Sequence, residues 1–430
     1  MVIIGGGFGG LNAAQGLASA QVQVTLIDRR NFHLFQPLLY QVATGALSPA
    51  NIAAPLRAVL KKQRNTEVVL GEVVDIDPAN RRVSLSDGMV EYDTLVLATG
   101  STHHYFGHPE WEFVAPGLKT IEDATEIRRR ILRAFEAAEQ SIDERAAAQY
   151  MTFVVVGGGP TGVEMAGAIG ELARQTLRRD FRRIDTAKSR ILLVEGTDRV
   201  LPPYRPKLSA KAQDSLQHLG VEVRTGAFVT DIKPGVVTIQ RDGTTEDVPA
   251  HTVIWAAGVA ASPLGRMLAD KLGVQVDRQG RVPVNADLTV ANHPEIFVIG
   301  DLAAVQTKGD SKATLPGVAP VAIQQGRFVA ATIRRRLAGE APRPFVYHDH
   351  GNMATIGRAA AVADLGWLTL SGYLAWLTWL FVHLLYLVSF QSRILVLIQW
   401  AWSYFTRNRA ARLITNEGKT PVVMRNDTKN

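Results

Sequence analysis

The chain has no cysteine among its 430 residues. This absence excludes disulfide bridges, iron–sulfur clusters, cysteine-ligated zinc and every thiol redox centre. Charged residues are few, at 20%, whereas hydrophobic residues reach 47%, which is high for a purely soluble protein. The net charge of +7 suits either nucleic acid or an anionic membrane. We find no nucleic-acid motif and expect no nucleic-acid partner, so a membrane surface is the better candidate.

A glycine-rich turn lies near the N-terminus. The order is strand, turn, helix, strand and acid, at residues 2–4, 5–10, 11–18, 22–27 and 28. Gly5 permits the tight turn, Gly7 lets backbone N–H groups approach a pyrophosphate, and Gly10 lets the helix pack closely on the strand. Asp28 lies at the spacing expected for a carboxylate that binds ribose hydroxyls. Together these features predict a dinucleotide-binding βαβ unit.

The same order of elements returns in the middle of the chain. Strand, turn, helix, strand and acid follow at residues 152–156, 157–162, 163–177, 191–194 and 195. Gly157, Gly159 and Gly162 repeat the glycine spacing, and Glu195 is the acid. A basic insert at 174–190 accounts for the longer interval before Glu195. Two copies of one signature make a stronger prediction than either copy alone.

Three further strands end in small residues. Their last positions are Thr99 and Gly100, Ala257 and Gly258, and Gly300 followed by Asp301. Small residues at the carboxyl end of a strand suit the close approach of a ligand in an open α/β sheet. Asp301 could accept hydrogen bonds from a second cofactor segment such as a ribityl chain, or it could be an N-cap.

The remaining pattern supports a coarse assignment of secondary structure. It predicts an irregular apolar segment at 29–40, helices over 51–63, 122–148 and 321–337, strands at 67–69 and 73–76, and a hairpin turn at 86–88. The helix over 122–148 carries four arginines that could form a phosphate or nucleic-acid patch, at 128, 129, 130 and 133. Interleaved acids favour instead a solvated, salt-bridged face, so we assign it no function.

The C-terminal part is apolar and rich in tryptophan. Residues 366–390 contain no Asp, Glu, Lys or Arg, which meets the length criterion for a membrane span. Five of the seven tryptophans lie beyond residue 366, as in an interfacial aromatic belt. Polar residues within the stretch and arginines after a second apolar segment at 394–405 favour a shallow monotopic anchor. The alternative is a buried dimer helix, and a dimer that builds a shared anchor would satisfy both.

The sequence resembles the bacterial type II NADH dehydrogenases, the single-subunit NADH:quinone oxidoreductases. The resemblance covers nearly the whole chain and is carried by residues 5–10, 31–45, 157–164, 300–301 and 319–326. The runs Phe-Gln-Pro-Leu-Leu-Tyr at 35–40 and Ala-Pro-x-Ala-x-Gln-Gln-Gly at 319–326 are its most specific parts.

The resemblance implies an α/β fold with two Rossmann-like dinucleotide-binding domains. The expected division is an FAD-binding domain at 1–115 and 284–350, an NADH-binding domain at 116–283 and a membrane-anchoring region at 351–430. In the FAD domain it places Asp28 on the ribose, Gly100 near the isoalloxazine and Asp301 near the ribityl phosphate. The full set of expected cofactor-binding residues is Gly5, Gly7, Phe8, Gly9, Gly10, Asp28, Arg29, Gln36, Val73, Thr99, Gly100, Asp301, Gly157, Gly159, Pro160, Thr161, Gly162, Glu195, Ala257 and Gly258.

The implied reaction moves two electrons from NADH through FAD to a membrane quinone, without proton pumping, in a respiratory electron transport chain. Glu164 could help deliver a proton near the nicotinamide and flavin, or it could be an ordinary acid of a helix first turn. Gln324 and Gln325 carry amides that can hydrogen-bond a quinone carbonyl, and their positions on different helix faces suggest that only one does so. We expect no metal site.

The expected setting is the cytoplasmic face of the bacterial inner membrane, with lipid contact and a homodimer. A carboxylate at Glu195 repels a 2′-phosphate and so favours NADH over NADPH, although Arg190 and Arg199 lie close in the sequence and oppose this preference. The residues leave the choice between ubiquinone and menaquinone open.

Two other functions fit parts of the pattern. A reductase of a soluble ferredoxin-like carrier shares both nucleotide domains but has no need of the apolar C-terminal stretch. A membrane-bound NADH sensor would bind both nucleotides without turnover. Sulfide:quinone oxidoreductases and disulfide reductases depend on cysteines that this chain lacks.

Overall fold

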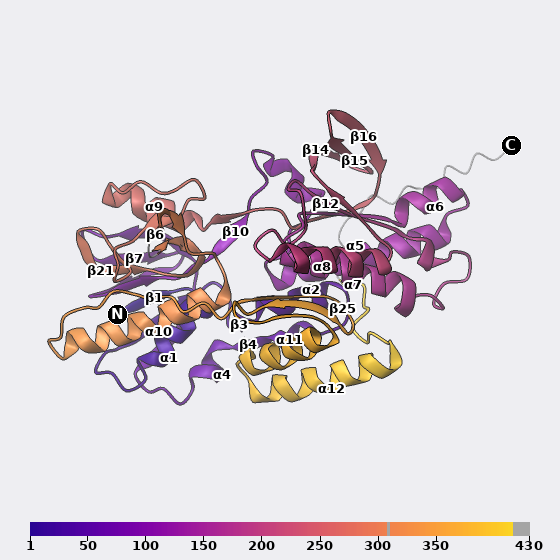
Figure 1. The fold of residues 1–430 in the computed structure, drawn as a ribbon. Helices are drawn as coiled ribbons and strands as arrows, with labels where there is room; N and C mark the ends of the chain where they lie inside the picture. Colours follow the sequence, from indigo (N-terminus) through magenta and orange to yellow (C-terminus); the bar gives the residue numbers. More distant parts are fainter. Residues whose placement is uncertain (308–309, 416–430) are drawn as a thin grey trace.

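The computed structural model describes residues 1–307 and 310–415. Its first unit is a largely parallel sheet with the strand order β20-β21-β9-β1-β2-β5 (Figure 1). These strands are β1 (Val2–Ile4), β2 (Val24–Asp28), β5 (Thr66–Leu70), β9 (Leu95–Leu97), β20 (Thr289–Val290) and β21 (His293–Val298). The central strands β1 and β9 are buried throughout, because elements cover both faces of the sheet.

Two helices cover one face of this sheet and a meander covers the other (Figure 1). The helices are α1 (Phe8–Gly16) and α10 (Ala319–Leu337), and the meander is β6 (Val73–Asp77), β7 (Arg82–Leu85) and β8 (Gly88–Glu91). The two helix backbones approach closely, since a Cβ atom placed on Gly326 would lie 2.2 Å from the Gly9 carbonyl oxygen. Helix α9 (Pro263–Leu272) packs against β6, although its residues fall in the range expected for the second domain.

The second unit repeats this plan with the parallel order β13-β12-β11-β17. Its strands are β11 (Thr152–Val156), β12 (Arg190–Glu195), β13 (Val221–Thr225) and β17 (Thr252–Trp255). Helices α7 (Pro160–Glu171) and α8 (Pro206–His218) lie on one side, and the meander of β14 (Ala227–Lys233), β15 (Val236–Arg241) and β16 (Thr244–Pro249) lies on the other. Strands β10 (Ser101–His103) and β18 (Val259–Ala261) pair antiparallel between the units. The predicted α/β fold with two Rossmann-like units is therefore confirmed.

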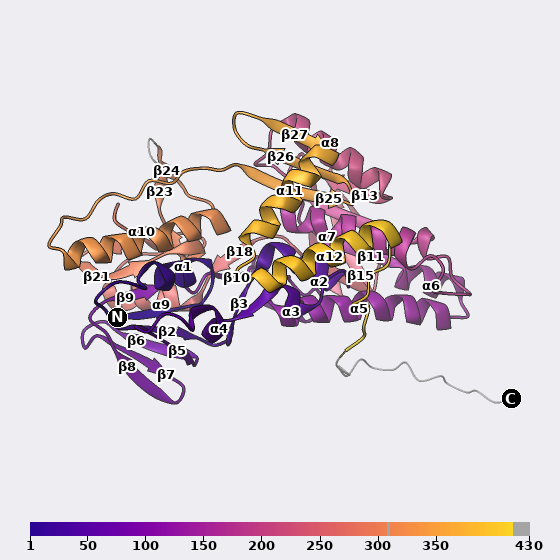
Figure 2. The same ribbon diagram turned by 90° about the horizontal axis from the view of Figure 1, so that it is seen from below.

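The C-terminal region packs on the second unit. Strands β25 (Asn352–Gly357), β26 (Ala360–Asp364) and β27 (Thr369–Gly372) form a small sheet against α7 and α8. Helices α11 (Tyr373–Tyr386) and α12 (Phe390–Thr406) follow, and Figure 2 shows them on the underside of the molecule. Within the described residues, no helix combines the length and the apolarity needed to cross a bilayer. Residues 416–430 of the expected anchor region lie outside the described residues.

The chain has further short strands and α-helices. They are β3 (Phe32–Leu34), α2 (Leu39–Ala43), α3 (Pro49–Ile52), β4 (Ala53–Pro55), α4 (Leu56–Leu60), α5 (Ile121–Gln140), α6 (Glu144–Tyr150), β19 (Val282–Pro283), β22 (Ala303–Ala304), β23 (Gln306–Thr307) and β24 (Asp310–Thr314). The single helix predicted over 51–63 is wrong. Because Pro55 disfavours helical backbone at the residue before it, the chain forms α3, β4 and α4 instead.

The long helix predicted over 122–148 is also wrong in its extent. The chain leaves the helical conformation at Ser141, and the Asp143 side chain accepts a hydrogen bond from the Arg145 N–H to start α6. The predicted salt bridges are present, since Glu126 pairs with Arg129. The prediction of a solvated face fails at Arg128 and Arg129, which are buried.

Candidate functional site

The first glycine turn has the backbone geometry that its spacing predicts. Gly5 has a φ of 103°, which L side chains rarely adopt, and a Cβ atom on it would lie 2.4 Å from the Ala98 carbonyl oxygen. A Cβ atom on Gly10 would lie 1.9 Å from the Gly5 carbonyl oxygen. A Cβ atom on Gly7, by contrast, meets nothing within 4 Å. The turn therefore leaves open space at Gly7, the N-cap of α1.

The second turn reproduces this geometry position by position. Gly157 has a φ of 107°, and a Cβ atom on Gly162 would lie 1.7 Å from the Gly157 carbonyl oxygen. Gly159 is the N-cap of α7 and, like Gly7, has open space where a Cβ atom would stand. The partial positive charge of a helix N-terminus faces open space at both turns, so both can bind a diphosphate.

The acids that end β2 and β12 hold the two turns in the same way. The Asp28 carboxylate accepts a hydrogen bond from the Gly6 N–H at 2.6 Å. The Glu195 carboxylate accepts the equivalent bond from the Gly158 N–H at 2.5 Å and a second from the Thr197 N–H at 2.7 Å. Each acid is thus fixed beside its glycine turn, where a ribose would lie.

A cavity of about 620 Å³ opens along the first turn and runs between the two units. This volume suits a small-molecule cofactor. The predicted site residues that line it are Gly5, Gly7, Phe8, Gly9, Asp28, Arg29, Gln36, Val73, Thr99, Gly100, Thr161, Glu164 and Asp301. The first strand, the first turn and the start of α7 therefore converge on one large cavity.

Polar side chains between the two units add to this wall. The Ser101 hydroxyl donates to the Asp301 carboxylate at 2.7 Å, and the Lys119 ammonium donates to the Ser101 hydroxyl at 2.8 Å. Lys119 also lies 3.8 Å from the Asp301 carboxylate. Sequence reasoning missed Ser101 and Lys119, because no motif marks a lone serine or lysine that tertiary packing brings to an acid.

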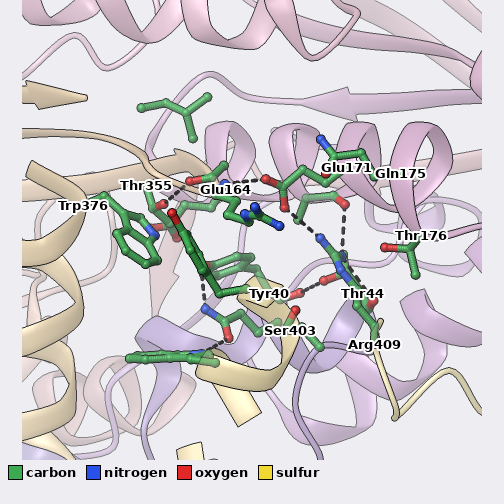
Figure 3. Close-up of a pocket in the computed structure, with 18 of the residues that line it drawn as sticks. Tyr40, Thr44, Glu164, Glu171, Gln175, Thr176, Thr355, Trp376, Ser403 and Arg409 are labelled. Carbon is green, nitrogen blue, oxygen red and sulfur yellow. Dashed lines mark hydrogen bonds and ion pairs between the residues drawn. The ribbon is translucent and has the colours of Figure 1, made fainter. Parts of the chain in front are cut away.

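A second cavity, of about 110 Å³, lies between the C-terminal helices and the second unit (Figure 3). Tryptophans 376, 379 and 400 line its apolar side. Glu171 and Arg409 line its polar side and form a buried ion pair of 2.9 Å between Arg409 Nη2 and Glu171 Oε2. Arg409 also donates to the carbonyl oxygens of Thr44, at the end of α2, and of Ala168, in α7, so it ties the C-terminal segment to both helices.

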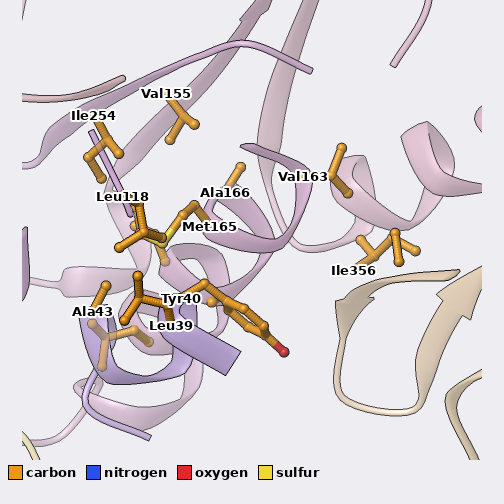
Figure 4. Packing of buried hydrophobic residues seen from close by; sticks show 14 of the residues in the cluster. Leu39, Tyr40, Ala43, Leu118, Val155, Val163, Met165, Ala166, Ile254 and Ile356 are labelled. Atoms are coloured by element: carbon orange, nitrogen blue, oxygen red, sulfur yellow. The ribbon is translucent and has the colours of Figure 1, made fainter. Parts of the chain in front are cut away.

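Tyr40 and Glu164 line both cavities. Tyr40, on α2, belongs to the hydrophobic cluster that also contains Met165 and Ala166 of α7 (Figure 4). Its hydroxyl accepts a hydrogen bond from the Gln41 side chain at 2.8 Å, and the Gln41 amide oxygen accepts one from the Trp400 indole at 2.7 Å. This chain of contacts connects the wall between the cavities to α12.

Burial raises the pKa of Glu164 to about 8, and a hydrogen bond from the Thr355 backbone acts in the opposite direction. The carboxyl is therefore largely protonated at neutral pH. A neutral carboxylic acid between two cavities can donate a proton to a group that enters either one.

Known proteins match both parts of the chain. The family described as pyridine nucleotide-disulphide oxidoreductases matches residues 1–326, and the NDH2 C-terminal domain matches residues 349–408. The type II NADH:quinone oxidoreductase Ndh of Mycobacterium tuberculosis is 47% identical, over 97% of this chain and 90% of that protein. NdhA of the same organism, another type II NADH:quinone oxidoreductase, is also 47% identical, over 97% of this chain and 89% of its own length. The chain belongs to the type II NADH:quinone oxidoreductases.

A solved structure supports the fold of this type II NADH:quinone oxidoreductase. NDH2 from Plasmodium falciparum, solved in complex with NADH, matches with a TM-score of 0.86 at 21% identity, over 96% of this chain and 99% of that one. The predicted enzyme class and the cofactors FAD and NADH are confirmed. Because the chain has no cysteine, the disulfide chemistry named in the wider family is absent here.

The residues of the large cavity fit FAD. The N-terminus of α1 faces the open space at Gly7, and Lys119 supplies positive charge near Asp301. The Thr99 hydroxyl oxygen is buried without a hydrogen-bond partner among the described residues, although Thr99 lines the cavity. An unpaired polar atom in a cavity wall is accounted for by a polar ligand.

Other predicted residues lie outside the linings of both cavities. Gly10 is buried between α1 and β1. The second turn and its neighbours form a separate group at the carboxyl end of the second sheet, which comprises Gly157, Gly159, Pro160, Gly162, Glu195, Ala257 and Gly258.

The two glutamines of α10 differ sharply. Gln324 exchanges two hydrogen bonds with the backbone of His348, at 2.8 and 3.0 Å. Gln325 is buried, and its amide oxygen accepts from the Gly300 N–H at 2.6 Å. Its amide nitrogen has no hydrogen-bond partner among the described residues. Of the pair, Gln325 thus has a donor to spare.

Proposed function

We propose that the large cavity binds FAD, that the second glycine turn binds the NADH diphosphate, and that quinone enters through the small cavity. The observation that carries this proposal is that Tyr40 and Glu164 line both cavities. A donor and an acceptor of electrons can thus approach one cofactor from two sides. The proposed domains are 1–115 with 284–350 for FAD, 116–283 for NADH and 351–430 for the membrane anchor, except that α9 (Pro263–Leu272) packs with the FAD unit.

FAD, when bound, supplies the redox chemistry that takes a hydride from NADH and delivers two electrons to quinone. The chain binds and orients it through the N-terminus of α1, with Asp28 on the ribose and Asp301 toward the ribityl chain. The hydrogen-bonded row of Lys119, Ser101 and Asp301 supports the last role, because it fixes the Asp301 carboxylate in the wall. Of the two glutamines, Gln325 has the spare donor, but neither glutamine lines either cavity. Gln325 instead holds Gly300, which lines the large cavity, by accepting a hydrogen bond from its N–H.

The residues around Glu195 support a preference for NADH over NADPH. Arg190 begins β12, at the opposite end of the strand from Glu195, and pairs with Glu222. Arg199 donates to the Pro202 carbonyl oxygen and lies 3.6 Å from Asp198. Both arginines therefore have partners, while the carboxylate that repels a 2′-phosphate stands at the turn.

Helices α11 and α12 are proposed to rest on the membrane surface. They expose large apolar side chains, among them Phe381, Phe390, Ile398, Trp402 and Phe405. Arg407, which ends α12, is exposed and can meet anionic lipid headgroups. A lipid-dissolved quinone would then reach the small cavity directly. We further propose a homodimer on the cytoplasmic face of the inner membrane.

Matched valine substitutions at Gly7 and Gly159 test the assignment of the two turns. Both residues have a φ of −70°, which valine adopts, and both have free space at the Cβ position, so the fold is expected to persist. Gly7→Val should purify without FAD. Gly159→Val should retain its yellow FAD while its KM for NADH rises about tenfold or more. Absorbance spectra and steady-state kinetics measure both effects. A Gly159→Val enzyme that loses FAD, or keeps the wild-type KM, contradicts the assignment.

A further inference from the structure

Phe228 is an aromatic side chain that the proposed site has not used. It is the second residue of β14, and 59% of its surface is exposed. Its ring lies against Gly196, because a Cβ atom on Gly196 would be 2.7 Å from the Phe228 Cε1 atom. Gly196 directly follows Glu195. A large apolar ring is thus held open to solvent beside the acid at the second turn.

The internal repeat gives Phe228 a counterpart. In the first unit Asp28 pairs with Leu70 in the register of β2 and β5, and Val73 follows three residues later. In the second unit Glu195 pairs with Thr225 in the register of β12 and β13, and Phe228 follows three residues later. Both residues lie at the start of a meander, β6-β7-β8 or β14-β15-β16.

The counterpart position is part of a ligand wall. Val73 lines the large cavity together with Gly71, Glu72 and Asp28, and the Gly71 N–H donates to the Asp28 carbonyl oxygen at 3.0 Å. Because the two units share strand order, turn geometry and acid, the position three residues beyond the acid's partner should face a ligand in the second unit as well. There the chain has a flat aromatic ring in place of valine.

We infer that Phe228 is the platform on which the adenine of NADH stacks. The inference rests on the proposed binding of NADH at the second turn. The adenine is joined to the ribose that Glu195 would bind, so the base extends over the residues that follow Glu195. Gly196 has no side chain, so the Phe228 ring can lie beside Glu195. Stacking between a purine and an aromatic side chain is strong enough to change binding about tenfold.

Kinetics with two electron donors test this inference. Phe228→Leu keeps an apolar side chain but removes the flat ring, and Phe228→Tyr restores it. Each variant is compared with NADH and with reduced nicotinamide mononucleotide, which lacks the adenosine half. Phe113→Leu is the matched control, because Phe113 is 80% exposed and lies in a short helix over residues 109–113. The inhibition constant of AMP provides a second readout, because AMP carries the adenine but cannot be oxidised.

Phe228→Leu should raise the KM for NADH about tenfold with kcat unchanged, and it should weaken AMP competition by the same factor. The KM for the mononucleotide should not change, and Phe228→Tyr and Phe113→Leu should behave as the wild type. Equal losses with both donors, or an unchanged KM for NADH, would overturn the platform. If Gly159→Val raises the KM for NADH while Phe228→Leu does not, the stacking of adenine on Phe228 is wrong but the binding of NADH at the second turn stands. If neither variant raises the KM for NADH, the proposed binding of NADH at the second turn is wrong.

Discussion

At the scale of single residues, Glu164 links the two halves of the proposed reaction. Its carboxyl lies between the cavities, and burial raises its pKa to about 8. The alternative of an ordinary first-turn acid is excluded, because Glu164 is the fifth residue of α7 and the first turn of that helix contains no acid. Quinone reduction consumes protons, so a carboxyl that is protonated at neutral pH is suited to supply one.

The rate of quinone reduction should therefore fall as the pH rises through about 8, because Glu164 then loses its proton. Glu164→Gln should be slower at neutral pH and should lose this dependence. Stopped-flow reoxidation of the reduced enzyme by a water-soluble quinone across this range measures both. Reduction by NADH in the same samples is the control. A Glu164→Gln enzyme with the wild-type pH profile would exclude the proton-donor role.

At the scale of elements, α11 and α12 form a short helical pair. Helix α11 has 14 residues, about 21 Å at 1.5 Å per residue, whereas the hydrocarbon core of a bilayer is about 30 Å thick. The chain breaks at residues 387–389 before α12 begins. The uncharged stretch at 366–390 is therefore divided among β27, α11 and the start of α12. Its exposed apolar side chains suit a helix pair that lies in the interface.

Replacing Phe381, Ile398 and Phe405 together by serine should lower binding to anionic vesicles about tenfold or more, since each exposed side chain loses apolar contact with lipid. Flavin reduction by NADH should not change. Vesicle cosedimentation measures the binding. The matched control replaces Met89, Phe113 and Ile142, which are also exposed but lie on other elements. Equal losses in the two triple variants would exclude α11 and α12 as the anchor.

The elements also show what the sequence could and could not predict. The two turns were predictable because glycine spacing, adjacent strands and terminal acids are local features, and the structure repeats them at Gly5 and Gly157. The break before Pro55 was also predictable, because the restriction that proline places on the preceding residue is local. The helix break at Ser141 and the burial of Arg128 depend instead on chain context and packing. The shared wall of Tyr40 and Glu164 could not be predicted, since the two residues lie far apart in the sequence and only the fold brings them together.

At the scale of the whole molecule, two similar α/β units and a helical pair surround two cavities that share the residues Tyr40 and Glu164. The large cavity lies along the first unit, and the small cavity lies between the second unit and α11 and α12. This arrangement favours quinone over a soluble ferredoxin-like carrier as the electron acceptor, because α11 and α12, which line the small cavity, expose apolar side chains. It also favours an enzyme over a sensor, because both substrates would reach one cofactor.

The most direct test is a stopped-flow experiment with two single substitutions in α12. Ser403 lines the small cavity, whereas Ala401 is exposed and lies outside its lining. NADH should bleach the flavin equally fast in the wild type, Ser403→Trp and Ala401→Trp. Reoxidation by a short-chain quinone should slow about tenfold or more in Ser403→Trp alone. Rapid reoxidation of Ser403→Trp by quinone would contradict the account.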